Sequence, residues 1–412
     1  MARKLPSQPE VNIGLVGHVD HGKTTLTQAL SGVWTDTHSE ERRRGISIKL
    51  GYADTAFYKT ESGQYYATGR NPEGGDDVDS ELQRVVSFVD APGHETLMAI
   101  MITGASIMDG AMLMIAANET CPQPQTREHL MALEIAGIQN IVIVQNKIDL
   151  VSRERALESY QEIQAFLEGT IAENAPIIPV SAHHDVNLDV LIEAIEKTIP
   201  TPDRDSDDRA VMHIARSFDV NRPGTRPTKL TGGVIGGSIV EGTFREGDEI
   251  TIGPGRKIEN GNKSYWEPIE TTITSMQGGG GKRNQMTAGG LCGFGTLLDP
   301  SVTTADNLSG QVLAKKGELP EVRTECAIEV HLMKNMVGGE GESEDKIHPL
   351  RNNEMLMVNV ATSTSVGIVK GVEKGRASLQ LRLPICADEG QRVSLSRRVG
   401  ARWRLIGHGT IL

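Results

Sequence analysis

The stretch that most constrains the fold of this chain is Gly17-His-Val-Asp-His-Gly-Lys-Thr24, which fits the GxxxxGK[ST] pattern of a phosphate-binding loop. An apolar run over Val11–Val16 precedes it and is typical of a buried strand, and Thr25–Leu30 continues as the start of a helix. Such a loop turns backbone N–H groups toward one anion, and Lys23 adds a positive charge. The Thr24 hydroxyl is then placed to bind a magnesium ion that bridges two phosphates. This order of elements predicts an α/β domain that binds a nucleotide.

The first half of the chain alternates apolar strands with amphipathic helices. This alternation predicts a mostly parallel sheet with helices on both faces. One of the helices covers Ser152–Glu168, with Ser152 as its N-cap and Leu157 among the residues of its apolar face. The expected strands are Val11–Val16, Val85–Val89, Ala111–Ala116, Ile141–Gln145 and Ile177–Val180.

A chain of 412 residues is too long for one hydrophobic core and indicates two or three domains. The segment Ile199–Arg209 has two prolines and a charge run, which favours a linker. Beyond it, short β-branched runs separated by Gly and Pro predict two small β-barrels. We therefore expect a nucleotide-binding domain over residues 1–205 and barrels over residues 206–321 and 322–412. Gly278–Gly281 and Gly338–Asp345 are expected to be mobile loops.

Composition excludes several classes of protein. The net charge of −12 argues against a protein that coats nucleic acid without specificity, because such binding needs a positive field. No apolar run reaches the roughly 18 to 20 residues of a membrane span, and the N-terminus does not resemble a secretory signal. The four cysteines lack CxxC spacing, which suits a reducing cytoplasm. The arginines near the C-terminus, Arg397 and Arg398 among them, are either solvated barrel charges or a local contact surface for RNA.

Three further motifs specify the nucleotide. Asp90-Ala-Pro-Gly93 follows a strand, so Asp90 can hold the magnesium through water and the Gly93 N–H can contact a γ-phosphate. Asn146-Lys-Ile-Asp149 follows the strand Ile141–Gln145, and its carboxylate can accept both the N1–H and the exocyclic amine of guanine. Adenine offers neither donor in that arrangement. Ser181-Ala-His183 can offer a backbone N–H to guanine O6. Together these motifs predict a GTPase.

The segment Glu40–Tyr52 could close on the nucleotide, with the Ser47 hydroxyl as a second magnesium ligand that senses the γ-phosphate. His94 directly follows the Asp90 motif and is the candidate that orients the attacking water, with Val19 and Ile46 as apolar walls. The alternative for His94 is a neutral structural histidine.

With these motifs the chain resembles the translational GTPases, and more narrowly the gamma subunits of archaeal and eukaryotic translation initiation factor 2, with the archaeal form favoured. The likeness extends over nearly the whole chain. The stretches that carry it include Gly17–Thr24, Asp90–Met98, Ala117–Thr126, Gln145–Leu150, Ala215–Gly224, Gly232–Gly237, Leu395–Val399 and Trp403–Gly407.

The resemblance implies a GTP-dependent carrier that delivers methionyl initiator tRNA to the small ribosomal subunit and hydrolyses GTP on start-codon selection. It also implies a cytoplasmic heterotrimer with alpha and beta subunits and no membrane partner. Similar proteins use the positions of Asp20 and Gly45 for a second magnesium, and Tyr52 matches an aromatic near the aminoacylated end of the tRNA. The position of Tyr52 is explained equally well by a strand residue that packs on the sheet.

The expected site residues form three groups. The catalytic group is His94, Lys23 and Gly93, and the magnesium ligands are Thr24, Ser47, Asp20, Gly45 and Asp90. The GTP-binding residues are Asp20, His21, Gly22, Lys23, Thr24, Thr25, Asn146, Lys147, Asp149, Ser181, Ala182 and His183.

One departure from the family pattern is the absence of a zinc knuckle, which would need two CxxC pairs. Thr60 and Gly63 stand where the first pair would lie, and Gly69–Asp79 holds no cysteine. We expect no zinc, and a metal-free hairpin or loop in its place. The other functions open to the sequence are an elongation-type or selenocysteine-specific factor, a sulfate-activating GTPase, and a scaffold that binds no nucleotide.

Overall fold

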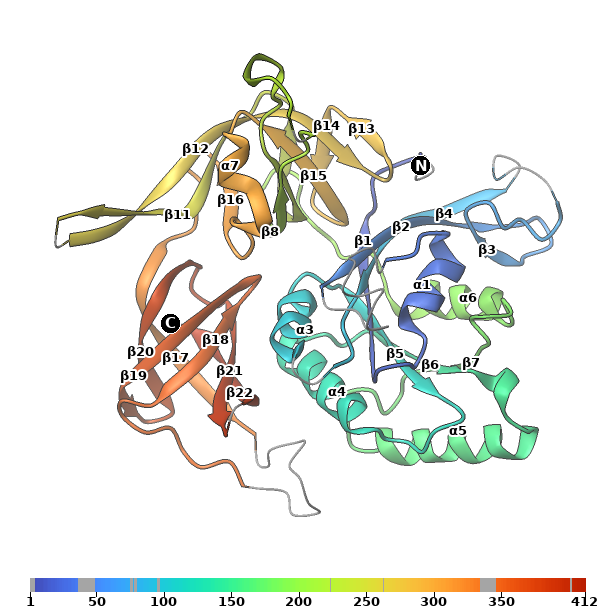
Figure 1. Ribbon diagram of the computed structural model, residues 1–412. Coiled ribbons are helices and arrows are strands. Elements are labelled where there is room, and N and C mark those ends of the chain that lie inside the picture. Colours follow the sequence, from blue (N-terminus) through green and yellow to red (C-terminus); the bar gives the residue numbers. More distant parts are fainter. Residues whose placement is uncertain are drawn as a thin grey trace. The chain divides into compact units, whose positions relative to one another are not determined.

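The computed structural model describes residues 4–35, 49–74, 77, 80–94, 97–222, 224–261, 263–333, 346–400 and 402–412. The chain forms two compact units, Met1–Pro202 and Asp203–Leu412 (Figure 1). No helix in the described ranges is both long enough and apolar enough to cross a membrane.

The first unit is built on one mixed sheet with the strand order β3-β2-β4-β1-β5-β6-β7. Strands β4, β1, β5, β6 and β7 are parallel, and β2 and β3 are antiparallel additions at one edge. The strands are β1 (Val11–Gly17), β2 (Gly51–Lys59), β3 (Tyr65–Ala67), β4 (Glu81–Asp90), β5 (Gly110–Ala116), β6 (Ile141–Asn146) and β7 (Ile177–Pro179). The predicted parallel core is confirmed.

Helices cover both faces of this sheet, as predicted (Figure 1). Helices α1 and α6 share a core with β1, β5 and β6, while α3 packs beside α4. The helices are α1 (Lys23–Ser31), α3 (Met98–Ala105), α4 (Pro124–Ala136), α5 (Arg153–Leu167) and α6 (Leu188–Thr198). Because both faces are covered, β1 and β5 are buried along their full length.

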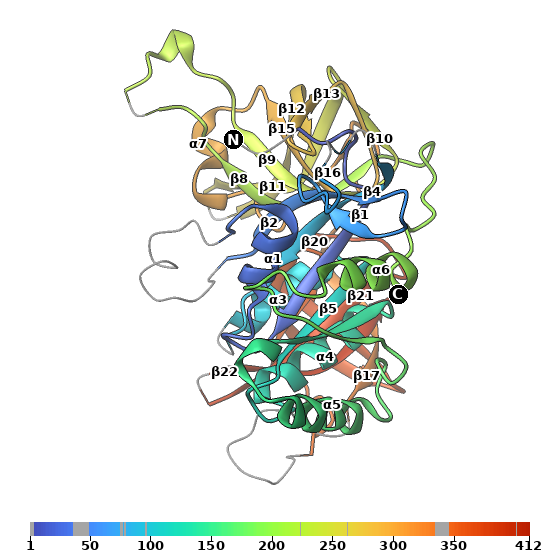
Figure 2. The same cartoon turned by 90° about the vertical axis from the view of Figure 1, so that its right-hand side faces the viewer.

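Helix α5 lies on the outside of the first unit in both views (Figures 1 and 2). Its predicted N-cap is confirmed, since the Ser152 side chain accepts a hydrogen bond from the Arg155 N–H. The prediction that Leu157 joins the apolar face is wrong, because its side chain is 57% exposed while Ile163 and Leu167 are buried. A peripheral helix buries only a narrow stripe, and Leu157 falls outside it.

The second unit contains two barrels with separate cores. In the first, the strand order is β11-β16-β8-β9-β15-β12-β13, and pairing of β11 with β12 closes the sheet. The second closes through β17-β20-β19-β18-β21-β22, so the predicted architecture of two small barrels is confirmed. The first barrel comprises β8 (Val211–Phe218), β9 (Val234–Glu241), β10 (Thr243–Arg245), β11 (Glu249–Asn260), β12 (Lys263–Gly278), β13 (Gly281–Arg283), β14 (Gln285–Thr287), β15 (Leu291–Thr296), α7 (Pro300–Thr303) and β16 (Val312–Lys315). The second comprises β17 (Val322–Leu332), β18 (Met355–Val360), β19 (Ser363–Glu373), β20 (Arg376–Cys386), β21 (Arg392–Val399) and β22 (Arg402–Ile411).

The glycine run Gly278–Gly281 is a tight hairpin turn rather than the expected mobile loop. Gly278 pairs with Gly281 across β12 and β13, and the two glycines between them have φ of 60° and 69°. Positive φ at both central positions is the signature of a type I′ hairpin, which glycine adopts without steric cost. The other expected loop, Gly338–Asp345, lies outside the described residues.

Candidate nucleotide-binding site

The phosphate loop connects β1 to α1 and is shaped by glycine and by backbone in the left-handed region. Gly17 has φ of 139° and Gly22 of 91°, and a Cβ on Gly17 would lie 2.4 Å from the Met114 carbonyl oxygen. The Lys23 Nζ donates to the carbonyl oxygens of Gly17 at 2.9 Å and His18 at 2.6 Å. The loop therefore curls around the Lys23 ammonium, as phosphate binding requires.

Asp90 brings β4 to this loop. It ends the strand beside β1, in register with Leu15, and is buried. Its Oδ2 accepts hydrogen bonds from the Thr24 hydroxyl at 2.8 Å and the Thr35 hydroxyl at 2.6 Å. One carboxylate and two hydroxyls thus meet, and hard oxygen ligands of this kind fit Mg²⁺. Thr35 carries no motif signal, and sequence reasoning missed it.

Gly93 lies against the phosphate loop. A Cβ added there would lie 2.6 Å from the Lys23 Nζ and 2.9 Å from both the Gly17 carbonyl oxygen and the Val19 nitrogen. Only glycine fits, so the backbone at Gly93 comes as close to the loop as the predicted phosphate contact needs. His94 follows directly and is half-buried. Gly45, Ile46 and Ser47 lie outside the described residues.

Two buried histidine rings fix the phosphate loop. His129 lies on α4, and His21 belongs to the loop itself and contacts β5. The His129 Nδ1 accepts the Gly17 N–H at 2.7 Å, and burial lowers the pKa of His129 to about 3. The His21 Nδ1–H donates to the Met114 carbonyl oxygen at 2.8 Å, and burial lowers the pKa of His21 to about 4. Both rings are therefore neutral at pH 7. The sequence motifs do not include His129. Its one sequence signal is that a polar residue stands at a buried position of α4, and that signal names no ligand.

Asn146 connects the phosphate loop to the loop that follows β7. Its Nδ2 donates to the His21 carbonyl oxygen at 2.9 Å, and its Oδ1 accepts the Ala182 N–H at 3.0 Å. A Cβ on Gly22 would lie 2.3 Å from this Nδ2, so the close approach also requires glycine. Asn146 thus holds two predicted nucleotide-binding segments at a fixed separation.

Asp149 lies in the short helix η3 (Ile148–Leu150), which begins directly after Lys147. Lys147 has φ of 64°. The Ser181 side chain lowers the pKa of Asp149, so the group is a carboxylate at neutral pH and can only accept hydrogen bonds. Ser181 is buried and bridges to Val186, whereas His183 is exposed. Such a carboxylate can accept the N1–H and the exocyclic amine of guanine.

All these segments lie at the carboxyl edge of the parallel strands. The phosphate loop follows β1, Asp90 ends β4, Asn146 ends β6, and Ser181 follows β7. Ligands bind at this edge in open α/β sheets. Asp20 lies in the phosphate loop, and Thr25 lies in the first turn of α1. Tyr52 of β2 pairs with Val89 of β4 and is partly exposed.

Comparison with known proteins agrees with this geometry. Residues 8–201 match the elongation factor Tu GTP binding domain, residues 232–314 match elongation factor Tu domain 2, and residues 324–411 match initiation factor eIF2 gamma, C terminal. In fold, the chain is similar to a bacterial selenocysteine-specific elongation factor (TM-score 0.73, 23% identity), over 98% of this chain and 58% of that one. The elongation factor SelB of Methanococcus maripaludis, solved with a GTP analogue, has a TM-score of 0.72 and 21% identity, over 99% and 80% of the two chains.

Sequence relatives are much closer. The chain is 57% identical to translation initiation factor 2 subunit gamma of Methanothermobacter thermautotrophicus, over 99% of this chain and 100% of that protein. It is also 57% identical to the protein of the same name from Archaeoglobus fulgidus, over 98% and 94% of the two chains. The GTP-binding domain belongs to a class of hydrolases that cleave GTP to GDP and phosphate. The chain therefore belongs to the gamma subunit family of translation initiation factor 2, and it is a translational GTPase that acts in initiation.

Proposed function

We propose that this GTPase carries methionyl initiator tRNA to the small ribosomal subunit and releases it when GTP is hydrolysed. The observation that supports a GTP-controlled carrier is the contact between Gly93 and the phosphate loop. Gly93 lies so close to Lys23 and Gly17 that any side chain would collide with them. A γ-phosphate that contacts both Lys23 and the Gly93 N–H would hold the segment after β4, and its loss would release that segment.

The residue roles follow from this arrangement. Lys23 and the backbone of residues 20–25 hold the phosphates, and Asp149, Ser181 and Ala182 recognise guanine, with Lys147 and His183 beside the base. Magnesium is held by Thr24 and Asp90, whose oxygens lie 2.8 Å apart, together with Ser47. Asp20 and Gly45 serve a second magnesium. The metal neutralises charge that develops on the phosphates during hydrolysis.

His94 orients the attacking water. Phosphoryl transfer depends on positioning and charge stabilisation, and a partner supplies what the isolated chain lacks, so hydrolysis by the chain alone is slow.

The partners are alpha and beta subunits, the tRNA and the small ribosomal subunit in the cytoplasm, with Tyr52 near the aminoacylated tRNA end. Residues 1–205, 206–321 and 322–412 act as three functional domains.

Binding of charged tRNA tests the proposal. With the assembled heterotrimer, affinity for methionyl initiator tRNA should be higher with a GTP analogue than with GDP, and higher than affinity for elongator tRNA. Equal affinity in the two nucleotide states, or a preference for an elongator or selenocysteinyl tRNA, would contradict it. The second outcome would favour an elongation-type factor, the class to which the structurally similar proteins belong.

A further inference from the structure

The segment Thr60–Gly74, called here the hairpin lobe, covers the region where the family resemblance led us to expect a metal-free hairpin or loop, and it is closed by hydrogen bonds. The Thr60 N–H donates to the Gln64 carbonyl oxygen at 2.9 Å, and β2 pairs with β3. The Ser62 hydroxyl donates to Glu73 at 2.6 Å, and the Gly69 N–H donates to the Asp77 carboxylate at 2.9 Å. The lobe is thus an ordered part of the first unit.

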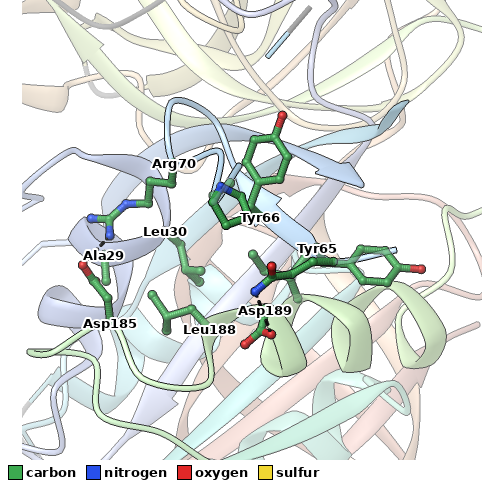
Figure 3. Close-up of a pocket in the computed structure, with 12 residues that line it drawn as sticks. Ala29, Leu30, Tyr65, Tyr66, Arg70, Asp185, Leu188 and Asp189 are labelled. Carbon is green, nitrogen blue, oxygen red and sulfur yellow. Dashed lines mark hydrogen bonds and ion pairs between the residues drawn. The ribbon is translucent and has the colours of Figure 1, made fainter. Parts of the chain in front are cut away.

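Two polar contacts join the hairpin lobe to the start of α6 and the loop before it. The Arg70 Nη1 lies 2.6 Å from the Asp185 Oδ2, and the Gln64 Nε2 donates to the Asp189 Oδ2 at 3.3 Å. Between them lies a pocket of about 270 Å³, with Leu30 and Leu188 in its wall (Figure 3). Ala67 of the lobe is buried in the core that also contains Leu188 and Ile192, so the polar contacts at the rim of the pocket add to the packing of the lobe on α6.

Asp185 belongs to the loop that contains Ser181, Ala182 and His183. This loop, residues 181–187, is called here the guanine loop. It is folded back by the pairing of Ser181 with Val186, and Asp185 itself has φ of 56°, in the left-handed region. Asp is one of the non-glycine residues that adopt this region most readily, and contacts of its side chain help to hold it there. The ion pair with Arg70 is a contact of this kind. Through it, the hairpin lobe can hold the guanine loop from outside the nucleotide site.

We propose that Arg70 is a positioning residue that holds the guanine loop in its nucleotide-binding conformation and slows nucleotide release. This inference rests on the proposed role of Ser181 and Ala182 in guanine binding. Arg70 touches no nucleotide and acts through Asp185. Both side chains are partly exposed, at 37% and 52%, so the effect is modest and depends on salt.

The dissociation rate of fluorescent GDP from the full chain tests this inference. Arg70→Ala should raise the rate about two- to fivefold at low salt, the range expected for one exposed ion pair. High salt should bring wild type close to the variant. Lys197→Ala is the matched control, because the exposed Lys197–Glu193 pair of 2.7 Å lies on α6 and not on the guanine loop. It should leave the rate unchanged.

A charge exchange separates positioning from loss of packing. Arg70→Asp combined with Asp185→Arg should return the rate toward wild type, whereas each single variant should raise it. Unchanged rates in all Arg70 variants, or a double variant no slower than the singles, would overturn the inference.

Asp149→Asn distinguishes this failure from failure of the proposed guanine site. An amide can donate to the extra carbonyl of xanthine, so this variant should lose GDP and gain xanthosine diphosphate. If it does so while Arg70→Ala has no effect, the site holds and the role of Arg70 is wrong. If it keeps its preference for GDP, the guanine assignment itself is wrong, and the inference falls with it.

Discussion

His129 and Asn146 support the phosphate loop from outside its motif. His129 accepts the Gly17 N–H, and Asn146 binds the His21 carbonyl oxygen and the Ala182 N–H. All three bonds are buried, so each replaces the water that the backbone would otherwise bind. The shape that surrounds a phosphate is therefore fixed by side chains from α4 and β6 as well as by the loop glycines.

Replacing His129 with Ala should weaken nucleotide binding. The buried Gly17 N–H would lose its acceptor, and such a loss costs about 1–3 kcal/mol, or about 5- to 150-fold in affinity if the loop distorts in response. Calorimetric titration with GDP measures the effect. His348→Ala serves as a control, because that side chain is exposed and belongs to the second unit. Unchanged GDP affinity in His129→Ala would show that the loop keeps its shape without this bond.

Helix α5 fixes the segment that carries Glu119. The Glu162 carboxylate accepts the Arg155 guanidinium at 2.6 Å and the Cys121 N–H at 2.8 Å, and Arg155 also donates to the Glu119 carbonyl oxygen at 2.8 Å. Glu119 in turn lies 3.4 Å from the His21 Nε2. A peripheral helix thus positions the segment whose Glu119 side chain lies against the phosphate loop.

Glu162→Ala should lower the free energy of unfolding by about 1–2 kcal/mol, since it removes a charged hydrogen bond and leaves the Cys121 N–H without its acceptor. Chemical denaturation followed by circular dichroism measures this. Glu158→Ala is the control on the same helix, because its contact with Arg155 is longer, at 3.5 Å, and its side chain is 67% exposed. Equal effects of the two changes would contradict a special role for Glu162.

The two C-terminal arginines of β21 differ in their surroundings. Arg397 pairs with Glu354 and donates to the His348 carbonyl oxygen at 3.0 Å, whereas Arg398 is exposed and donates to the Gly400 carbonyl oxygen. Arg397 therefore stabilises its own barrel. Of the two readings that the sequence allowed, this favours the structural one for Arg397 and leaves contact with RNA open for Arg398.

At the scale of the whole molecule, acid should destabilise both units. Burial lowers the pKa of His21 and His213 to about 4 and that of His129 to about 3, against 6.5 for an unperturbed histidine. The unfolded chain therefore binds more protons below pH 6.5, so the stabilisation is fully present above that pH and is lost as pH falls toward 4.

The slope is about 1.4 kcal/mol per pH unit for each histidine in this window. Chemical denaturation at several pH values from 7.5 to 5 measures this slope. The slope of the first unit reflects His21 and His129, and that of the second unit reflects His213. His213→Leu should flatten the pH dependence of the second unit alone. A second unit whose stability is independent of pH in the wild type would contradict the buried neutral state of His213.

Strands β2 and β3 were not among the strands expected from the sequence. The sequence by itself determined the parallel strands of the first unit and the barrel architecture, and it predicted the phosphate and guanine motifs. These features depend on neighbouring residues, through periods of two and 3.6 and through loops that follow strands directly. The tertiary structure alone decided which distant residues support them. His129 lies 112 residues from Gly17, and Asn146 lies 125 residues from His21. Such contacts arise only when the sheet brings strand ends together. No local pattern therefore records that His129 supports the phosphate loop, that Thr35 bonds Asp90 or that Arg70 reaches Asp185.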